Sequence, residues 1–417
     1  MMKKKIAALL ALASLVVGPM QVLATDTPVV NPGASGAEVG VSLTQVQQNS
    51  TVDPIVIKAK WEMRAKRSTD TNSAKRVGYW VDGANYNNYW YEDDDPTART
   101  DGAQFYPSGD ENVFSYISVC GVIDHPWLRN ASDLSKFVVS ADVYYPEVES
   151  VGKQFCGNFY KEIILSPLAY NDGIKLMCGL DAEQGVFQRD PSIVSRYGFS
   201  ESDICYQLAQ EQSKVFCGIL PLSYEAPAGD YLVKIIANGQ GLSPVEQTNY
   251  FTYYQLPSFK IDNTSVAYNN GNPIDTNVEN NLSGTVEGDP LFVLNDGKPT
   301  LKGTGNVQLN IRVEQDDMGF GESTMSDQTI KSNVLYKARL GNAVNWANIG
   351  YYKPTNTNQI SSNDYVDLST LDLSQDQKLD LGVLVKKFPP THPVGSPYAG
   401  AMTLTGTAIP FESCSVN

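Results

Sequence analysis

The clearest alternation of hydrophobic and polar positions lies in residues 223–239, SYEAPAGDYLVKIIANG. The Pro-Ala-Gly run at residues 227–229 has the chemistry of a tight turn. After it, every second side chain would face the same way: Tyr231, Val233, Ile235 and Ala237. A period of two predicts a β-strand with one buried face, so this stretch is predicted to be a strand entered through a turn.

The same alternation predicts further strands in the first half of the chain. Residues 54–65 are expected to form the first strand, with these side chains on one face: Ile55, Ile57, Ala59 and Trp61. Later strands are expected at residues 113–123, 136–146, 159–166, 174–180, 215–225 and 249–259. Residues 199–214 instead repeat apolar positions at helical spacing, and Ser200 with Asp203 forms a capping signal. They are the one helix that the pattern predicts.

The second half of the chain shows strands and almost no helical periodicity. Strands are expected at residues 299–317, 333–341, 379–388 and 401–409, separated by turns rich in Asn, Gly, Ser and Asp. Near its end, Gly395 and Pro397 precede Tyr398, which is a weaker copy of the turn, Tyr and strand at residues 227–237.

These patterns together predict the fold class. A late strand that opens with Tyr, whose hydroxyl bonds back at the corner, is typical of immunoglobulin-like sandwiches. We therefore predict a mainly β protein with two tandem immunoglobulin-like β-sandwich domains. The first is expected at residues 51–257 and contains long loops, disulfides and one short helix; the second is expected at residues 258–417.

The N-terminus predicts export. Lys3, Lys4 and Lys5 precede an apolar run at residues 6–17, and Val-Leu-Ala at residues 22–24 suits cleavage after Ala24. Residues 1–24 are therefore predicted to be a signal peptide, which makes the mature protein secreted, extracellular or bound to the cell surface. The run is too short to span a membrane, and no transmembrane segment is expected in the mature chain.

The segment that follows has two interpretations. Residues 25–50 are rich in Thr, Pro, Gly and Ser, which predicts a flexible linker or N-terminal arm. Within it, GVSLTQVQ at residues 40–47 alternates enough to act as a donor strand that completes a sheet edge of a neighbouring copy.

Charge and cysteine content narrow the possible partners. The formal net charge of −15 disfavours nucleic acid as a binding partner.

The cysteines predict disulfides. In an exported chain without a C-x-x-C pair, an even number of cysteines favours disulfides over metal ligation: Cys120, Cys156, Cys178, Cys205, Cys217 and Cys414. Because the other five lie in the first half, Cys414 either folds back onto the first domain or pairs between molecules.

Catalytic chemistry finds little support in the sequence. The two histidines, His125 and His392, each stand beside Pro, and no motif for nucleophilic, metal-dependent or phosphate-binding catalysis accompanies them. Both are expected to be structural or solvent-facing, and the protein is not expected to be an enzyme. A secreted hydrolase with paired carboxylates is the least favoured alternative. The 46 acidic residues offer many pairs, but the sequence does not give the separation of any pair.

Residues 78–109 mix aromatic, Asn and acidic side chains. Tyr and Trp can stack on sugar rings, or they can pack at a sheet edge or subunit contact. The candidates for a glycan-binding or assembly surface are Tyr79, Trp80, Tyr86, Tyr89, Trp90 and Tyr91.

Two acidic clusters are candidate calcium sites, because calcium takes about six to eight oxygen ligands from carboxylates and carbonyls. The first is Glu92, Asp93, Asp94 and Asp95, with Asp101 nearby. The second is Glu314, Gln315, Asp316 and Asp317. The alternative is a solvated acidic turn. Calcium is the one cofactor that the sequence suggests.

Glycosylation sequons occur at four positions: Asn49, Asn130, Asn263 and Asn281. They would mark accessible loops if the host attaches N-glycans.

Two short segments in the second half resemble a known class of domain. Residues 303–306, Gly-Thr-Gly-Asn, form a glycine turn before a strand; Tyr398, Gly400 and the Met-Thr-Leu-Thr run at residues 402–405 form a second motif. Together they resemble the immunoglobulin-like modules of prokaryotic envelope, S-layer and extracellular-fibre proteins. The resemblance implies a building-block or adhesion role and transfers no catalytic residue.

These features favour a secreted cell-surface structural or interaction protein that assembles into, or decorates, an extracellular layer or fibre. The expected partners are further copies of the chain or other envelope proteins. The alternative is an adhesin or carbohydrate-binding protein that binds glycans through residues 79–91.

Overall fold

A computed structural model describes the chain from residue 53 to residue 414, with gaps. The described residues are 53–67, 76–82, 87–92, 99–109, 112–129, 133–150, 153–179, 185–190, 192–274, 276, 282–321, 333–349, 352–353, 366–389 and 397–414. The predicted signal peptide and N-terminal arm lie outside them and stay predictions. The described part is mainly β, as predicted, and it belongs to one compact unit, residues 52–417.

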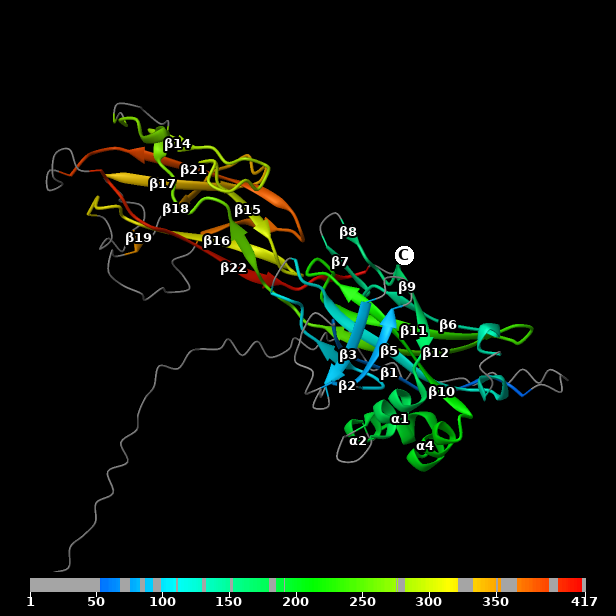
Figure 1. Cartoon of the computed structure of the whole chain (residues 1–417). Coiled ribbons are helices and arrows are strands. Elements are labelled where there is room, and N and C mark those ends of the chain that lie inside the picture. Colours follow the sequence, from blue (N-terminus) through cyan, green and yellow to red (C-terminus); the bar gives the residue numbers. More distant parts are fainter. Residues whose placement is uncertain are drawn as a thin grey trace, which may run out of the picture. The chain divides into compact units, whose positions relative to one another are not determined.

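The first lobe, residues 53–256, is built on a ten-stranded sheet (Figure 1). Its strands are β1 (Val56–Arg67), β2 (Arg76–Asp82), β3 (Asn87–Glu92), β4 (Ala103–Phe105), β5 (Ser115–Asp124), β6 (Phe137–Tyr144), β9 (Phe159–Pro167), β10 (Ser213–Leu222), β11 (Gly229–Gly239) and β12 (Val245–Tyr253). Their order in the sheet is β2-β3-β1-β5-β10-β9-β6-β11-β12-β4. Neighbours are antiparallel except β12 and β4, which run parallel.

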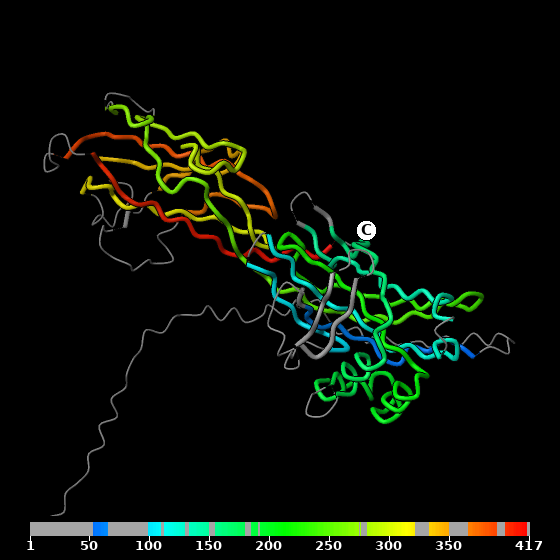
Figure 2. The backbone as a smooth tube through the Cα atoms, in the orientation of Figure 1, coloured from blue at the N-terminus to red at the C-terminus, as the bar shows by residue number. Residues whose placement is uncertain are grey.

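The sheet folds over on itself, so that its two halves enclose a core. Alternate side chains of β5 and β10, such as Val119 and Leu220, belong to the same buried cluster as Val143 of β6, Val233 of β11 and Phe251 of β12. The winding of the strands can be followed in Figure 2. This arrangement is a β-sandwich, in which the strand β9 passes from one half to the other by pairing with β10 at one end and β6 along its length.

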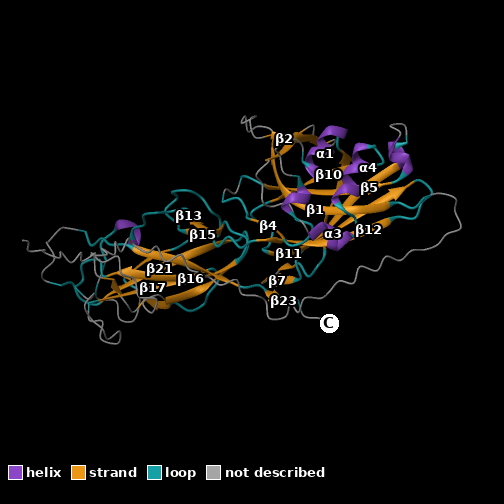
Figure 3. Ribbon diagram, turned by 90° about the horizontal axis from the view of Figure 1, so that it is seen from below, coloured by secondary structure: helices purple, strands orange, loops and turns teal. Residues whose placement is uncertain are grey.

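Short helices cover the outer face of β1, β5 and β10 (Figure 3). They are α1 (Tyr170–Cys178), α2 (Val186–Arg189), α3 (Ser192–Tyr197) and α4 (Glu201–Ala209). A second buried cluster joins Trp61, Cys120 and Val215 of the strands to Leu176 of α1 and Ile204 of α4. These three strands are therefore buried on both faces.

The prediction of one helix is wrong, because the described residues contain four α-helices. Residues 174–180, predicted as a strand, lie mostly in α1, where Gly173, Leu176 and Met177 are buried at helical spacing. The predicted helix exists as α4: Ser200 caps it, and its hydroxyl accepts a hydrogen bond from Asp203 N at 3.1 Å. It ends at Ala209 because the chain enters β10 at Ser213.

The strand β1 contains a bulge that the sequence pattern did not show. Its register against β5 shifts between Ile57 and Ala59. As a result, Ile57 belongs to the sandwich core, whereas Ala59 and Trp61 belong to the cluster beneath the helices. The prediction that these apolar residues share one face is therefore wrong, since a bulge exchanges the two faces of a strand beyond it.

The second lobe, residues 257–411, has two sheets (Figure 1). The first contains β13 (Phe259–Ile261), β15 (Thr300–Gly303), β21 (Asp376–Val385), β17 (Val334–Leu340) and β18 (Ala347–Ile349), with β14 (Gly284–Val286) also on β21. The second contains β19 (Tyr352–Lys353), β16 (Gln308–Asp316), β20 (Val366–Leu371) and β22 (Met402–Ile409), all beside β16. The predicted strand at residues 299–317 divides into β15 and β16. One separate buried cluster, including Leu309, Tyr336 and Leu381, forms the core.

Tyr398 does not repeat the role of Tyr231. Its ring stacks on that of Phe320, with centroids 4.3 Å apart, and β22 shows no alternation of buried and exposed residues. The division into two immunoglobulin-like domains stays a prediction.

Three short 3₁₀ turns and a small sheet complete the described elements: Pro126–Arg129, Leu134–Lys136, Tyr268–Gly271, and β7 (Val148–Ser150), β8 (Lys153–Gln154) and β23 (Glu412–Ser413). In the small sheet, β23 pairs with β7, so the end of the described chain returns to the first lobe. Asn306 also holds the lobes together, because its side chain accepts from Leu256 N at 2.6 Å and donates to Tyr254 O at 2.8 Å.

Tyr231 opens β11 as the sequence predicts. The side chains of Tyr231, Val233, Ile235 and Ala237 are all fully buried, and the Tyr231 hydroxyl donates to Pro227 O at 2.9 Å. The bond closes the turn before the strand, and burial raises the pKa of the hydroxyl, which keeps it a donor at neutral pH.

We expect Tyr231→Phe to lower the free energy of unfolding by about 1–3 kcal/mol, because the buried Pro227 carbonyl loses its donor. Urea denaturation under non-reducing conditions measures this. Tyr206→Phe is the matched control, since Tyr206 is 64% exposed, and it should leave stability unchanged. Equal stability of the two variants would contradict the role of this bond.

Candidate functional site

The outer side of β9, β6, β11 and β12 is a sheet face that no described helix covers, whereas helices cover the other half of the sandwich (Figure 1). We call it the open face and define it by its outward side chains: Val138, Asp142, Tyr144, Phe159, Glu162, Ile164, Leu232, Lys234, Ile236, Glu246, Thr248 and Tyr250. All of them are half-buried or exposed. These side chains are thus accessible across four neighbouring strands.

A row of large side chains crosses the open face at one level. Strand register places Phe159 beside Tyr144, Tyr144 beside Leu232, and Leu232 beside Tyr250. The rings of Phe159 and Tyr144 meet edge to face with centroids 5.8 Å apart. Phe159 is 55% exposed and Tyr250 39% exposed. Three strand spacings make this row roughly 14 Å long.

The next row along the strands is charged. Glu162 lies beside Asp142, and Asp142 beside Lys234. Lys234 Nζ pairs with Glu246 across the β11–β12 pair at 3.2 Å. Beyond this row lies Ile164, which is 60% exposed. Three carboxylates and one ammonium group make the open face both apolar and acidic.

The acids on the open face affect one another. Partial burial raises the pKa of Asp142, and the neighbouring Glu162 raises it further, although Lys234 opposes both. The hydrogen bond to Glu246 raises the pKa of Lys234, which stays charged. Burial and nearby acids also raise the pKa of Tyr250. The charged row therefore carries uncompensated negative charge at neutral pH.

The aromatic candidates from the sequence lie on a different part of the sheet. Residues 76–92, where no strand was predicted, contain the antiparallel strands β2 and β3, with Tyr79 opposite Trp90, Trp80 opposite Tyr89, and Tyr91 opposite Gly78. Tyr86 lies outside the described residues. The structure brings the described members onto one hairpin and leaves their glycan-binding role a prediction.

The first acidic cluster is only partly described. Glu92 is the last residue of β3, and Asp93, Asp94 and Asp95 lie outside the described residues. Asp101 accepts a hydrogen bond from Tyr250 N at 3.1 Å and pairs with Arg196 at 2.7 Å. Its carboxylate thus ties the edge of β12 to α3.

The second acidic cluster is buried, so its interpretation as a solvated turn is wrong. Asp316 and Asp317 are 7% and 3% exposed. The Asp316 carboxylate accepts from Met318 N at 3.0 Å and Ala401 N at 2.8 Å, and Asp317 accepts from Gly319 N at 3.0 Å. These carboxylates cap backbone N–H groups in a turn.

Within the described residues, the one group with metal-binding spacing is Glu149 with Cys156 and Cys414. Both sulfurs belong to a disulfide, which removes them as thiolate ligands. Calcium binding at either acidic cluster stays a prediction.

All six cysteines form disulfides, as predicted: Cys120–Cys217, Cys156–Cys414 and Cys178–Cys205. The first joins β5 to β10 and the third joins α1 to α4. The second confirms that Cys414 can return to the first lobe, across a sequence separation of 258.

Two further sequence candidates have structural roles. His125 is 1% exposed, and its Nδ1 accepts from Trp127 N at 3.1 Å, which confirms the structural interpretation. Asn263 is 5% exposed and donates to Asp262 and Asp296, so the acceptor side chain of this sequon is buried, although Thr264 and Ser265 beside it are exposed. His392, Asn49, Asn130 and Asn281 lie outside the described residues.

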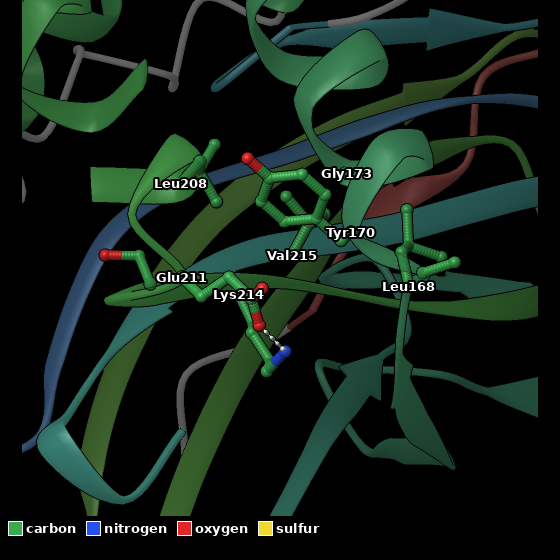
Figure 4. A pocket seen from close by; sticks show the side chains of 9 residues that line it. Leu168, Tyr170, Gly173, Leu208, Glu211, Lys214 and Val215 are labelled. Carbon is green, nitrogen blue, oxygen red and sulfur yellow. Dashed lines mark ion pairs between the residues drawn. The ribbon is translucent and has the colours of Figure 1, made fainter. Parts of the chain in front are cut away.

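A small pocket lies beneath the helices, between α1, the end of α4 and the start of β10 (Figure 4). Its volume is about 10 Å³, room for about one water molecule. Tyr170 closes it and donates to Ala209 O at 2.8 Å. It is too small for an organic ligand, so the open face is the stronger candidate site.

The open face was not predicted from the sequence, although the alternating pattern of one of its strands was visible there. The alternation that placed Val233 and Ile235 in the core also placed Leu232, Lys234 and Ile236 on the opposite face. What the sequence lacked was the strand order, which sets Phe159 and Tyr250 in one row although they are far apart in the chain.

No helix in the described residues has the length and hydrophobicity needed to cross a membrane. No protein-family model matches the sequence, and no curated protein matches it.

Three solved structures show a distant similarity to the chain. A chaperone–tip adhesion subunit pre-assembly complex, CsuC–CsuE from the archaic chaperone-usher Csu pili of Acinetobacter baumannii, is 9% identical with a TM-score of 0.23, covering 73% of this chain and 97% of that one. The C-terminal domain of the Streptococcus pyogenes antigen I/II-family protein AspA is 10% identical with a TM-score of 0.19, covering 84% and 95%. A structure described as BspA_C_WT is 10% identical with a TM-score of 0.15, covering 69% and 87%.

We expect Asp142→Asn to stabilise the protein at pH 7. The pKa of Asp142 is higher in the folded protein than its unfolded value of 3.8, so folding favours the protonated carboxyl. Its contribution to stability is therefore fully present below pH 3.8 and is lost as pH rises through the folded pKa. The neutral Asn avoids this loss. Urea midpoints of the two proteins should therefore differ at pH 7 and converge near pH 3; a variant less stable at pH 7 would contradict this account.

Proposed function

We propose that this protein is a secreted structural protein that assembles at the cell surface, and that its open face docks on a second surface of the next copy. The observation that carries the proposal is the exposed, apolar and acidic open face, which no described helix covers, whereas helices bury the opposite side of the sandwich. Three disulfides support an oxidising location outside the cell, in agreement with the predicted signal peptide.

Charge disfavours contact between two open faces. Such a pairing would bring Glu162, Asp142 and Glu246 of one copy near the same acids of another, and like charges in contact are destabilising. A heterologous contact, between the open face and a different surface, avoids this repulsion. Repeated heterologous contacts generate rings or open-ended fibres.

A surface with complementary chemistry lies on the second lobe. The loop at residues 291–294 exposes Leu291, Val293 and Leu294 by 65%, 47% and 69%. Lys298 follows it, and Lys302 lies over the Phe292 ring at 5.9 Å, next to Lys260 in the β13–β15 pair. Three lysines therefore lie at this surface, together with Asp296 and with Asp289, which pairs with Lys298 at 3.5 Å. We call it the basic loop surface, residues 289–302 with Lys260.

We expect mature protein, residues 25–417, to form ordered assemblies that electron microscopy and light scattering detect. Glu162→Lys on the open face and Lys298→Glu on the basic loop surface should each weaken assembly, and the double variant should restore it. Higher salt should weaken assembly of the wild type, because exposed charges are screened.

Glu211→Lys is the matched control, since Glu211 is exposed on the helical side, and it should assemble as the wild type does. A monomer under all conditions, with or without millimolar calcium, would overturn the proposal. Assembly that tolerates both single reversals but fails when residues 25–50 are deleted would assign the contact to the N-terminal arm instead.

The aromatic row favours a second candidate function, which is binding of a neutral polysaccharide. Aromatic side chains stack on apolar sugar faces, and the adjacent Asp142 and Thr248 can accept hydrogen bonds from hydroxyls. On a glycan array, monomeric protein should retain neutral glycans, and Tyr250→Ala should lose them while Tyr206→Ala does not. Retention unaffected by Tyr250→Ala would exclude the row as the glycan site.

A further inference from the structure

Three polar side chains meet inside the first lobe, where β1 approaches β12. Lys60 and Glu62 of β1 are 0% exposed, and Asn249 of β12 is 1% exposed. We call them the Lys–Glu–Asn triad. It lies outside the open face and the basic loop surface, and the proposed function does not use it.

The contacts within the triad are specific. Lys60 Nζ donates to one carboxylate oxygen of Glu62 and to Asn249 Oδ1. Asn249 Nδ2 donates to the other carboxylate oxygen of Glu62 and to Thr100 O, the latter at 2.9 Å. The amine thus lies against the amide carbonyl, and one carboxyl group contacts both the amine and the amide nitrogen.

The bulge in β1 produces this arrangement. Beyond it, Trp61 faces the helices, so Lys60 and Glu62 face the interior of the sandwich. Gly121 is the cross-strand partner of Lys60 and has no side chain; a Cβ there would lie 3.2 Å from Ile235 Cδ1. Tyr197 of α3 contacts the same strand, since its hydroxyl donates to the backbone O of Lys60 at 3.1 Å.

Burial also sets the protonation of the triad. Desolvation lowers the pKa of Lys60 and raises the pKa of Glu62, and it outweighs the attraction between them. Nearby Arg196 lowers the pKa of Lys60 further, whereas Asp101 raises the pKa of both groups. These directions favour transfer of the proton from Lys60 to Glu62, which leaves a neutral amine, the nucleophilic form of lysine.

We propose that Lys60 and Asn249 join in an intramolecular amide bond that links β1 to β12, with Glu62 as the catalytic acid and base. The bond would close the chain from residue 60 to residue 249 into a loop that survives reduction of the disulfides. No cofactor or oxidant is needed.

The reaction balances within the triad. The Lys60 Nζ lone pair attacks Asn249 Cγ, forming a C–N bond, and the carbonyl electrons move onto Oδ1. Glu62 gives its proton to Nδ2 and takes one from Nζ. When the carbonyl re-forms, the Cγ–Nδ2 bond breaks and ammonia leaves. The products are a secondary amide, ammonia and Glu62 in its starting protonation state.

A second lysine of β1 provides an internal comparison. Lys58 donates to the side-chain oxygen of Gln207 and pairs with Asp124 at 2.6 Å. Here, however, the Asp124 side chain is 24% exposed and Gln207 is half-buried. The Lys58 side chain itself is 5% exposed, but its carboxylate partner reaches water, whereas Glu62, the partner of Lys60, is fully buried. We therefore expect no cross-link at Lys58.

The test is the mass of the purified mature protein after reduction and alkylation. We expect the measured mass of the wild type to be lower, by one ammonia, than the mass calculated from its sequence. Its tryptic digest should contain a branched peptide that joins the segments around Lys60 and Asn249. Lys60→Arg and Asn249→Ala should show the full mass and linear peptides. Gln207→Ala, the matched control, should stay cross-linked.

The wild-type measurement decides the proposal even if variants fold poorly. Full mass with Lys60 and Asn249 in separate linear peptides would overturn it and leave the triad as a non-covalent cluster. Loss of ammonia without the branched peptide would overturn it too, since it would indicate a succinimide at Asn249. Glu62→Gln should fold by circular dichroism yet remain largely unlinked; complete cross-linking of this variant would remove Glu62 from the catalytic role.

Discussion

The bulge after Ile57 determines where every later side chain of β1 lies, and much of the first lobe depends on it. Because the strand period is two, a shift of one residue exchanges the two faces. Trp61 and Met63 consequently face outward from the sandwich, where they need the helical layer to bury them. Lys60 and Glu62 face inward, where only polar partners make burial tolerable. One irregular residue thus explains two features of the first lobe. Trp61 and Met63 need a helical layer to bury them, and Lys60 and Glu62 are buried as part of a polar triad.

The helical layer in turn divides the sandwich into two unequal sides. Strands β1, β5 and β10 are buried on both faces, which is unusual for an antiparallel sheet and gives them nearly continuous apolar sequences. Strands β6, β11 and β12 instead alternate, with one face in the core and one exposed. The first side is therefore buried beneath the helices, and the second side is exposed. The charged row on the second side keeps that surface soluble while its aromatic row stays exposed.

Local features of this fold could be predicted from the sequence. The corner bond of Tyr231 and the Ser200 cap depend on residues within a few positions of each other, so their signals are complete in a short window. The bulge at Ile57 and helix α1 could not be predicted in this way, because an apolar run such as residues 174–180 fits a buried strand or a buried helix equally well. Tertiary packing under β1 decided in favour of the helix.

Features that depend on distant residues were beyond the sequence. Six cysteines predict disulfides but leave many connectivities, and the structure selects one. Lys60 and Asn249 are 189 positions apart, and each is an ordinary residue in its own strand. The same is true of the row from Phe159 to Tyr250. Candidate sites of this kind are visible only when strand order and register are known.

The Cys156–Cys414 disulfide has a mechanical consequence for a protein proposed to act at the cell surface. Tension applied at residue 53 and at Cys414 would run along the chain to Cys156 and cross the disulfide. Residues 157–413, which include the whole second lobe, lie outside that covalent path. The second lobe would therefore stay unloaded while the disulfide is intact, and reduction would place it in series with the first lobe. In this geometry a single redox event changes how far the molecule can stretch.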